Sequence, residues 1–200
     1  MIAAAAHFGA RGLGIELDPV LVEASRRNAA SAGVADRVRF VQGDVLHADF
    51  AQASVVTVYL LPSLINRLQP RLLDELRPGT RIVSHAFVMT GWAPDRTHTM
   101  RIAQRHERQG DSSTVHLWVV PAKARGRWSG DGWEMAVSQN FQQIDVEARR
   151  DGRPVPVGKA VLSGREIAWE MEGARFEGRV ADDAISGTFA GRPLVLEKRP

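Results

Sequence analysis

The spacing of hydrophobic residues changes near residue 122 of the chain. Before that point, short apolar runs alternate with segments whose apolar residues recur every three or four positions, as in helices. From Arg127 onward, apolar and polar residues alternate one by one, and turns rich in Gly and Asp separate the short segments. The first pattern predicts strands that alternate with helices, and the second predicts an antiparallel β meander.

The first pattern predicts an α/β fold. The expected strands are 13–17, 38–41, 55–60, 81–87 and 114–120, and the expected helices are 19–33 and 64–76. The run at 55–60 is continuously apolar, as in a strand buried on both faces. Pro70 predicts a kink or a division into two short helices. Strands that alternate with helices pair in parallel, so we expect a doubly wound, Rossmann-like sheet.

The second pattern predicts a separate β domain. We expect domains at 1–121 and 127–200, joined by residues 122–126. The meander would form a small barrel or a sheet that packs on the first domain. Tryptophan is enriched here, and packing in the core is the default explanation for these rings.

Composition narrows the class of protein. The chain has 200 residues, of which 44% are hydrophobic and 24% charged, as in soluble globular proteins. No segment approaches the roughly 18 apolar residues that span a bilayer, and MIAAAA lacks the features of a signal peptide. The absence of cysteine excludes disulfides and thiol chemistry. We therefore expect a cytoplasmic protein without a membrane span.

The chain is weakly basic. The net charge is +3, with 23 arginines and three lysines, and most arginines alternate with acids. The densest basic stretch is Arg96 to Arg108, which fits either a patch for nucleic acid or an exposed helix face. The exposed helix face is the favoured interpretation, so no nucleic-acid partner is expected.

Acidic residues follow two expected strands. Glu16 closes the first strand and Asp18 follows it, while Asp44 comes after the second. Ligands of open α/β sheets bind beyond the carboxyl ends of the strands, where a carboxylate can accept hydrogen bonds from ribose hydroxyls. For Glu16 and Asp44 ligand binding is favoured. For Asp18 the position before Pro19 favours a helix cap.

Three segments resemble class I S-adenosylmethionine-dependent methyltransferases, namely GLGIELDP, RVRFVQGDVL and VVTVYLLP. The resemblance implies that Glu16, with Leu17 beside it, binds the ribose of S-adenosyl-L-methionine. It also implies that Asp44 and Val45 hold adenine. Tyr59, Leu60 and Pro62 would line the pocket for the methyl acceptor, although a core position for Tyr59 is equally compatible with the sequence.

The stretch from Val58 to Thr97 is similar to the lysine methyltransferases that act on the ATP synthase c subunit. The similarity includes a Trp-x-Pro-Asp element, here Trp92 to Asp95, and suggests a protein lysine as acceptor. His85 is within reach of such an acceptor, but a hydrogen-bonded histidine in the core is favoured. No residue is assigned as general base.

The glycine-rich first motif of these methyltransferases has no counterpart here. IAAAAHFGARG resembles only the end of the helix that follows that motif. We therefore expect an incomplete sheet in an N-terminally truncated chain, with two strand edges that lack partners. Such a chain would fold poorly in its first half or self-associate, and it would be inactive if the missing motif is indispensable.

Other functions are less compatible with the sequence. The six histidines are scattered and form no HExxH pair, so no metal is expected. The sequence has neither a GxSxG motif nor a Walker motif, which argues against a hydrolase and against an NTPase. A dinucleotide-dependent oxidoreductase fits the strand–acid pattern but not VVTVYLLP. The alternative from another class is a non-catalytic module that binds a partner through its β meander.

Overall fold

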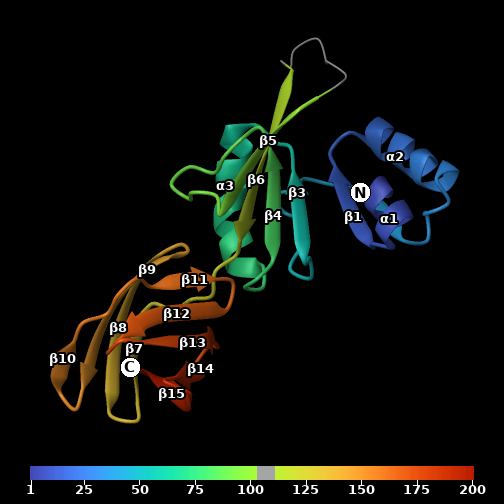
Figure 1. Cartoon of the computed structure of the whole chain (residues 1–200). Coiled ribbons are helices and arrows are strands. Elements are labelled where there is room, and N and C mark those ends of the chain that lie inside the picture. The colour runs from blue at the N-terminus through green and yellow to red at the C-terminus, as the bar shows by residue number, and fades with distance from the viewer. Residues whose placement is uncertain (103–110) are drawn as a thin grey trace. The chain divides into compact units, whose positions relative to one another are not determined.

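The computed structural model describes residues 1–102 and 111–200 (Figure 1). These residues form two compact units, Met1–Phe50 and Ala51–Pro200. No helix among the described residues is both long and apolar enough to cross a membrane. The expected boundary between domains at 122–126 stays a prediction.

The first unit, which we call the N-terminal unit, is a small α/β layer. Its elements are α1 (Ile2–Phe8), β1 (Gly12–Glu16), α2 (Pro19–Ser31) and β2 (Val38–Gln42). β1 and β2 pair in parallel, with Glu16 opposite Gln42. Asp18 caps α2, because its Oδ1 accepts a hydrogen bond of 2.8 Å from the amide of Val20, and Pro19 occupies the first helical position. The predicted cap is confirmed.

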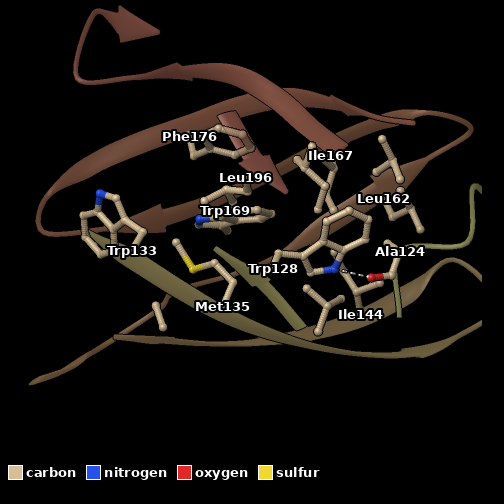
Figure 2. Close-up of a cluster of buried hydrophobic side chains, with 14 of the residues drawn as sticks. Ala124, Trp128, Trp133, Met135, Ile144, Leu162, Ile167, Trp169, Phe176 and Leu196 are labelled. Atoms are coloured by element: carbon tan, nitrogen blue, oxygen red, sulfur yellow. Dashed lines mark hydrogen bonds between the residues drawn. The ribbon is translucent and has the colours of Figure 1, made fainter. Parts of the chain in front are cut away.

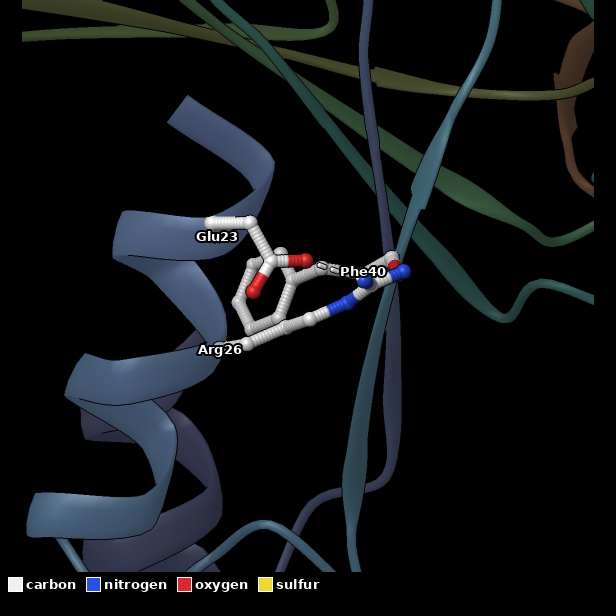
Figure 3. A network of polar contacts seen from close by, with 3 residues as sticks. All are labelled: Glu23, Arg26 and Phe40. Carbon is white, nitrogen blue, oxygen red and sulfur yellow. Dashed lines mark hydrogen bonds and ion pairs between the residues drawn. The ribbon is translucent and has the colours of Figure 1, made fainter. Parts of the chain in front are cut away.

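Arg26 attaches α2 to the sheet (Figure 3). Its guanidinium donates to the carbonyl oxygen of Phe40 in β2, with an Nη2–O distance of 2.9 Å, and it pairs with Glu23 one helical turn earlier. This contact fixes the helix over the strand at a point where the core itself is small. The main cluster of buried residues in the unit consists of Ala5, Ala29, Val34 and Val38.

The second unit begins with a four-stranded sheet. Its elements are β3 (Val55–Val58), α3 (Pro62–Glu75), β4 (Arg81–His85), β5 (Arg96–Arg101) and β6 (Ser112–Val119). The strand order is β3-β4-β6-β5; β3 and β4 are parallel, whereas β6 runs antiparallel to both of its neighbours. Within the described residues β1 pairs only with β2, and β3 only with β4. The expected incomplete α/β architecture is confirmed.

Two local predictions were wrong, and one of the two alternatives at Pro70 is excluded. Residues 55–60 are not buried on both faces: Val55 is 41% exposed, because β3 is an edge strand of its sheet. Pro70 lies inside one continuous helix, so α3 is not divided into two, while the alternative of a kink stays a prediction. Arg96–Arg101 forms an exposed strand held by β6, and not a helix face; positions 103–108 of the basic stretch lie outside the described residues.

The rest of the second unit is an antiparallel meander in one nine-stranded sheet. The strands are β7 (Gly126–Gly130), β8 (Trp133–Asn140), β9 (Gln143–Arg150), β10 (Arg153–Val155), β11 (Val161–Ser163), β12 (Glu166–Met171), β13 (Ala174–Val180), β14 (Ala184–Phe189) and β15 (Arg192–Arg199). β15 pairs with β7, so the order is β10-β9-β8-β7-β15-β14-β13-β12-β11. Two-residue turns such as Asp131-Gly132 have positive φ at both positions, as hairpins with primed turns require. The predicted meander is confirmed.

The alternating residues of these strands build a large core (Figure 2). Seventeen buried hydrophobic residues form one cluster. Trp169 and Phe176 stack at its centre, with ring centroids 4.4 Å apart, and they face each other in register on β12 and β13. Trp128 donates from Nε1 to the carbonyl of Ala124 over 2.9 Å, which satisfies its polar atom inside the core.

Candidate active site

The carboxyl ends of β1 and β2 carry the predicted acidic residues. Glu16 is the last residue of β1, and Asp44 follows β2 by two positions. The amide of Gly43 donates to the carbonyl of Glu16 over 2.9 Å, which joins the two strand ends just before Asp44. Parallel pairing therefore places both carboxylates at one edge of the same small sheet.

Glu16 is half-buried, and its carboxylate is oriented by the backbone that follows it. Oε1 accepts hydrogen bonds from the amides of Leu17 and Asp18, at 2.7 and 3.0 Å. Oε2 has no hydrogen bond within the described part of the chain. A carboxylate that is held by one oxygen and has the other available suits a diol ligand such as ribose, because the acceptor is fixed before the ligand arrives.

Asp44 has local partners at both oxygens. Oδ1 accepts from the amide of Leu46 over 2.9 Å, and Oδ2 lies 3.3 Å from Nδ1 of His47, whose side chain is exposed. Asp44 itself is exposed and Val45 is half-buried. The contacts are those of an acidic residue that closes a turn, and the binding of adenine by Asp44 and Val45 stays a prediction.

In the second unit, three rings gather at the carboxyl ends of β3 and β4; we call Tyr59, His85 and Phe87 the aromatic cluster. The Tyr59 ring lies 5.0 Å from the His85 ring and 6.4 Å from the Phe87 ring, measured between centroids. Tyr59 is 65% exposed, so it does not occupy the core. Leu60 is half-buried and Pro62 is the exposed first residue of α3.

His85 has a fixed partner in β6. Its Nε2 lies 2.7 Å from Oγ of Ser113, across the antiparallel pairing of β4 and β6. When Nε2 donates to this hydroxyl, Nδ1 is left with a lone pair that can accept a proton. No local pattern in the sequence points to Ser113, because 28 residues separate it from His85 and only the register of the two strands brings them together.

Comparison with known proteins identifies the class of protein to which the first part of the chain is similar. The sequence profile of the ANTKMT methyltransferase domain matches residues 1–96. A protein-lysine N-methyltransferase of Saccharolobus islandicus (strain REY15A) is 33% identical over 121 residues, which are 60% of this chain and 71% of the relative. This chain belongs to the same methyltransferase family as the Saccharolobus islandicus relative.

Other relatives extend the family assignment. A lysine N-methyltransferase of the ATP synthase c subunit from Mus musculus is 36% identical over 97 residues. The chain spans 39% of that relative and 48% of its own length in this match. A crystal structure of an RNA methyltransferase from Salinibacter ruber, in complex with S-adenosyl-L-homocysteine, is 50% identical, with a TM-score of 0.53. It covers 61% of this chain, and the chain covers 73% of it.

The family assignment confirms the predicted resemblance and the methyltransferase class of the chain. The profile ends at residue 96, before β6 and the nine-stranded sheet begin. Ser113 and the whole β meander therefore lie outside the matched domain. Among the described residues, no group of His, Asp and Glu side chains is arranged so that it could hold a metal ion.

Proposed function

We propose that this chain transfers a methyl group from S-adenosyl-L-methionine to the side-chain amine of a protein lysine. The observation that carries the proposal is the match to the ANTKMT methyltransferase domain, in which Glu16 stands at the end of β1 with one carboxylate oxygen available. Relatives named as lysine methyltransferases support lysine as the acceptor.

The N-terminal unit supplies the groups that would hold the cofactor. Glu16 would accept hydrogen bonds from the ribose hydroxyls, with Leu17 beside it, while Asp44 and the amide of Val45 would hold adenine. When bound, S-adenosyl-L-methionine supplies the methyl group on its positively charged sulfur. Each charge-assisted hydrogen bond to Glu16 would contribute about 1.5–3 kcal/mol to binding.

The aromatic cluster supplies the groups that would receive the acceptor. The exposed ring of Tyr59 would contact the alkyl chain and the charged amine of lysine, an attraction of about 0.5–1 kcal/mol at an exposed site. The amine must lose a proton before it can attack, and Nδ1 of His85 would accept that proton while Ser113 holds the other ring nitrogen. Leu60 and Pro62 would complete the apolar wall.

A second acceptor class has support from one observation. The Salinibacter ruber structure that shares 50% identity with this chain is described as an RNA methyltransferase. Aromatic rings such as Tyr59 also stack on unpaired bases, so RNA is the second candidate acceptor. Lysine remains the first candidate, because several relatives are named as lysine methyltransferases.

Isothermal titration of S-adenosyl-L-methionine tests the first part of the proposal. We expect a micromolar Kd for the wild-type chain and a Kd roughly 10- to 100-fold higher for Glu16→Ala, because at least one charge-assisted hydrogen bond is lost. Asp36→Ala is the matched control, since Asp36 is an exposed acidic residue of the same unit. A wild-type chain that binds no cofactor would contradict the proposal and favour a non-catalytic module.

Transfer of a radiolabelled methyl group tests the acceptor. The wild-type chain is incubated with labelled cofactor and either a lysine-containing peptide library or unstructured RNA. Label on the peptides, and its loss in libraries with lysine replaced by arginine, would support a lysine acceptor. Label on RNA alone would overturn lysine and favour the second candidate.

A further inference from the structure

The segment 86–95 between β4 and β5, which we call the acceptor loop, is held from several sides. It begins directly after His85, and it contains Phe87 of the aromatic cluster. At its centre, Trp92 is only 1% exposed. A connection that carries part of a proposed binding site, and whose middle residue is fully buried, has a conformation fixed by what packs around it.

One of these holding contacts comes from the nine-stranded sheet. The turn between β8 and β9 consists of Phe141 and Gln142, and both reach the acceptor loop. The Phe141 ring stacks on the Trp92 ring, with centroids 5.5 Å apart and planes 8° from parallel. Such stacking contributes beyond the area that it buries.

The side chain of Gln142 completes this contact with two hydrogen bonds. Its Oε1 accepts from Nε1 of Trp92 over 2.9 Å, and its Nε2 donates to the carbonyl of Ala93 over 2.7 Å. One amide group therefore satisfies a buried indole nitrogen and a backbone carbonyl of the same loop. A substitution that removes the amide leaves the indole nitrogen of the buried Trp92 without this partner, which costs more than the loss of a solvent-exposed hydrogen bond such as the one to Ala93.

The residue at the first position of the turn is uncommon for its backbone conformation. Phe141 has a φ of 54°, in the left-handed region that the hairpin turns of this sheet share but that residues with a bulky side chain rarely adopt. Asn or Gly would satisfy this backbone conformation more readily. A phenylalanine at this position, despite its backbone strain, indicates that the ring makes a favourable contact, and the stack on Trp92 is such a contact.

α3 and β6 hold the loop as well. Asn66 of α3 exchanges two hydrogen bonds with Thr90, at 2.8 and 2.9 Å. Nε1 of Trp118 in β6 donates to the carbonyl of Trp92 over 2.9 Å. The turn at Phe141 and Gln142 is thus the contribution of the β meander to a loop that α3 and β6 also hold.

We propose that the nine-stranded sheet positions the acceptor loop, so that recognition of the methyl acceptor depends on Phe141 and Gln142. Both act as positioning residues, because they touch the loop and not the acceptor. This inference rests on the proposed function, since it assigns the acceptor to the aromatic cluster. It gives the β meander, which lies beyond the matched domain, a role in the same reaction.

The test compares Gln142→Ala and Phe141→Asn with wild type. Phe141→Asn keeps the left-handed backbone and removes only the ring, and Gln143→Ala is the control, because Gln143 is exposed in the next position. We expect the amide hydrogens of 86–95 to exchange at least tenfold faster in both variants. We expect KM for the lysine peptide to rise about tenfold, with an unchanged Kd for S-adenosyl-L-methionine.

A conservative variant separates positioning from simple loss of stability. Gln142→Glu keeps the oxygen that accepts from Trp92 but loses the donor to Ala93, so we expect an intermediate KM. An unchanged exchange rate in 86–95, or an unchanged KM, overturns the proposal. If the wild-type chain transfers no methyl group to peptide or RNA, the proposed function fails, and the exchange rates alone decide whether the turn holds the loop.

Discussion

The two ends of the chain bury very different cores. The N-terminal unit has a cluster of four buried residues, none of them larger than valine, behind a two-stranded sheet. The nine-stranded sheet buries seventeen hydrophobic residues, among them three tryptophans, in one cluster (Figure 2). Since burial of apolar area is the dominant stabilising contribution, the second region is the more stable one.

The region with the larger core is not the region that carries the residues proposed to bind the cofactor. Glu16 and Asp44, the residues proposed to bind the cofactor, belong to the region with the small core, where β1 has one ladder partner among the described residues. The nine-stranded sheet contains none of the predicted site residues, yet it supplies the turn that holds the acceptor loop. The variants below test whether stability is as unevenly distributed as the two cores imply.

Trp169→Ala should have the largest effect. Trp169 is fully buried and stacks on Phe176, so the substitution leaves a cavity at the centre of the larger core. We expect the free energy of unfolding of the nine-stranded sheet to fall by about 3–5 kcal/mol, measured from urea denaturation followed by tryptophan fluorescence.

The control for this variant is Glu170→Ala, the adjacent exposed position on β12. Nε1 of Trp169 has no hydrogen-bond partner in the described residues, so the loss reflects packing alone. A decrease below about 1 kcal/mol for Trp169→Ala would mean that this core is not the main source of stability in the sheet.

Val38→Ala should have a smaller and local effect in the N-terminal unit. Val38 is buried in the four-residue core, and removal of two methyl groups should cost about 1.5–2 kcal/mol. We expect faster amide exchange throughout Met1–Phe50 and unchanged exchange in β7 to β15, because the two regions open separately. Val20→Ala is the control, since Val20 is 69% exposed on α2. Equal loss of protection in both regions would show that they unfold as one.

The sequence predicted the antiparallel meander of the better-packed region, although not every one of its strands. Strict alternation of apolar and polar residues predicts strands wherever one face is buried, and the Asp-Gly turns divide the meander correctly. The exposed strand Arg96–Arg101 was missed, because all its side chains face solvent and leave no apolar period to detect. Its conformation comes from pairing with β6, which is a tertiary effect.

The candidate site was predicted only in part. Residues at strand ends, such as Glu16 and Tyr59, can be found from the sequence because the ends of apolar runs mark them. Ser113 and Gln142 cannot, because they lie 28 and 50 residues from their partners His85 and Trp92. Strand pairing brings Ser113 to His85, and packing of a hairpin turn against a loop brings Gln142 to Trp92. Residues that orient other residues, unlike those at strand ends, therefore could not be identified from the sequence.

Asp18→Ala tests the local order of the N-terminal unit with an effect of about 1 kcal/mol. The variant loses the cap on the amide of Val20 at the start of α2, directly after the strand end that carries Glu16. Fraying of this turn should also weaken the orientation of Glu16, so we expect a Kd for S-adenosyl-L-methionine a fewfold higher. Asp18→Asn, which retains a capping oxygen, should behave like wild type; equal losses in both variants would assign the effect to charge instead.

The smallest effect is expected at the surface of the larger region. Glu166→Ala removes an ion pair with Arg179 on the neighbouring strand, with a distance of 3.0 Å between Oε1 and Nε. Both side chains are about two-thirds exposed, at 65% and 68%, so water and salt screen the pair and its contribution should stay below about 0.5 kcal/mol. Urea denaturation at low and at high salt measures the contribution of the ion pair to the free energy of unfolding, and the loss in Trp169→Ala serves as the reference for a large effect. A loss above about 1 kcal/mol that vanishes at high salt would mean that charges on the outer face, and not the buried rings alone, make this region the more stable of the two.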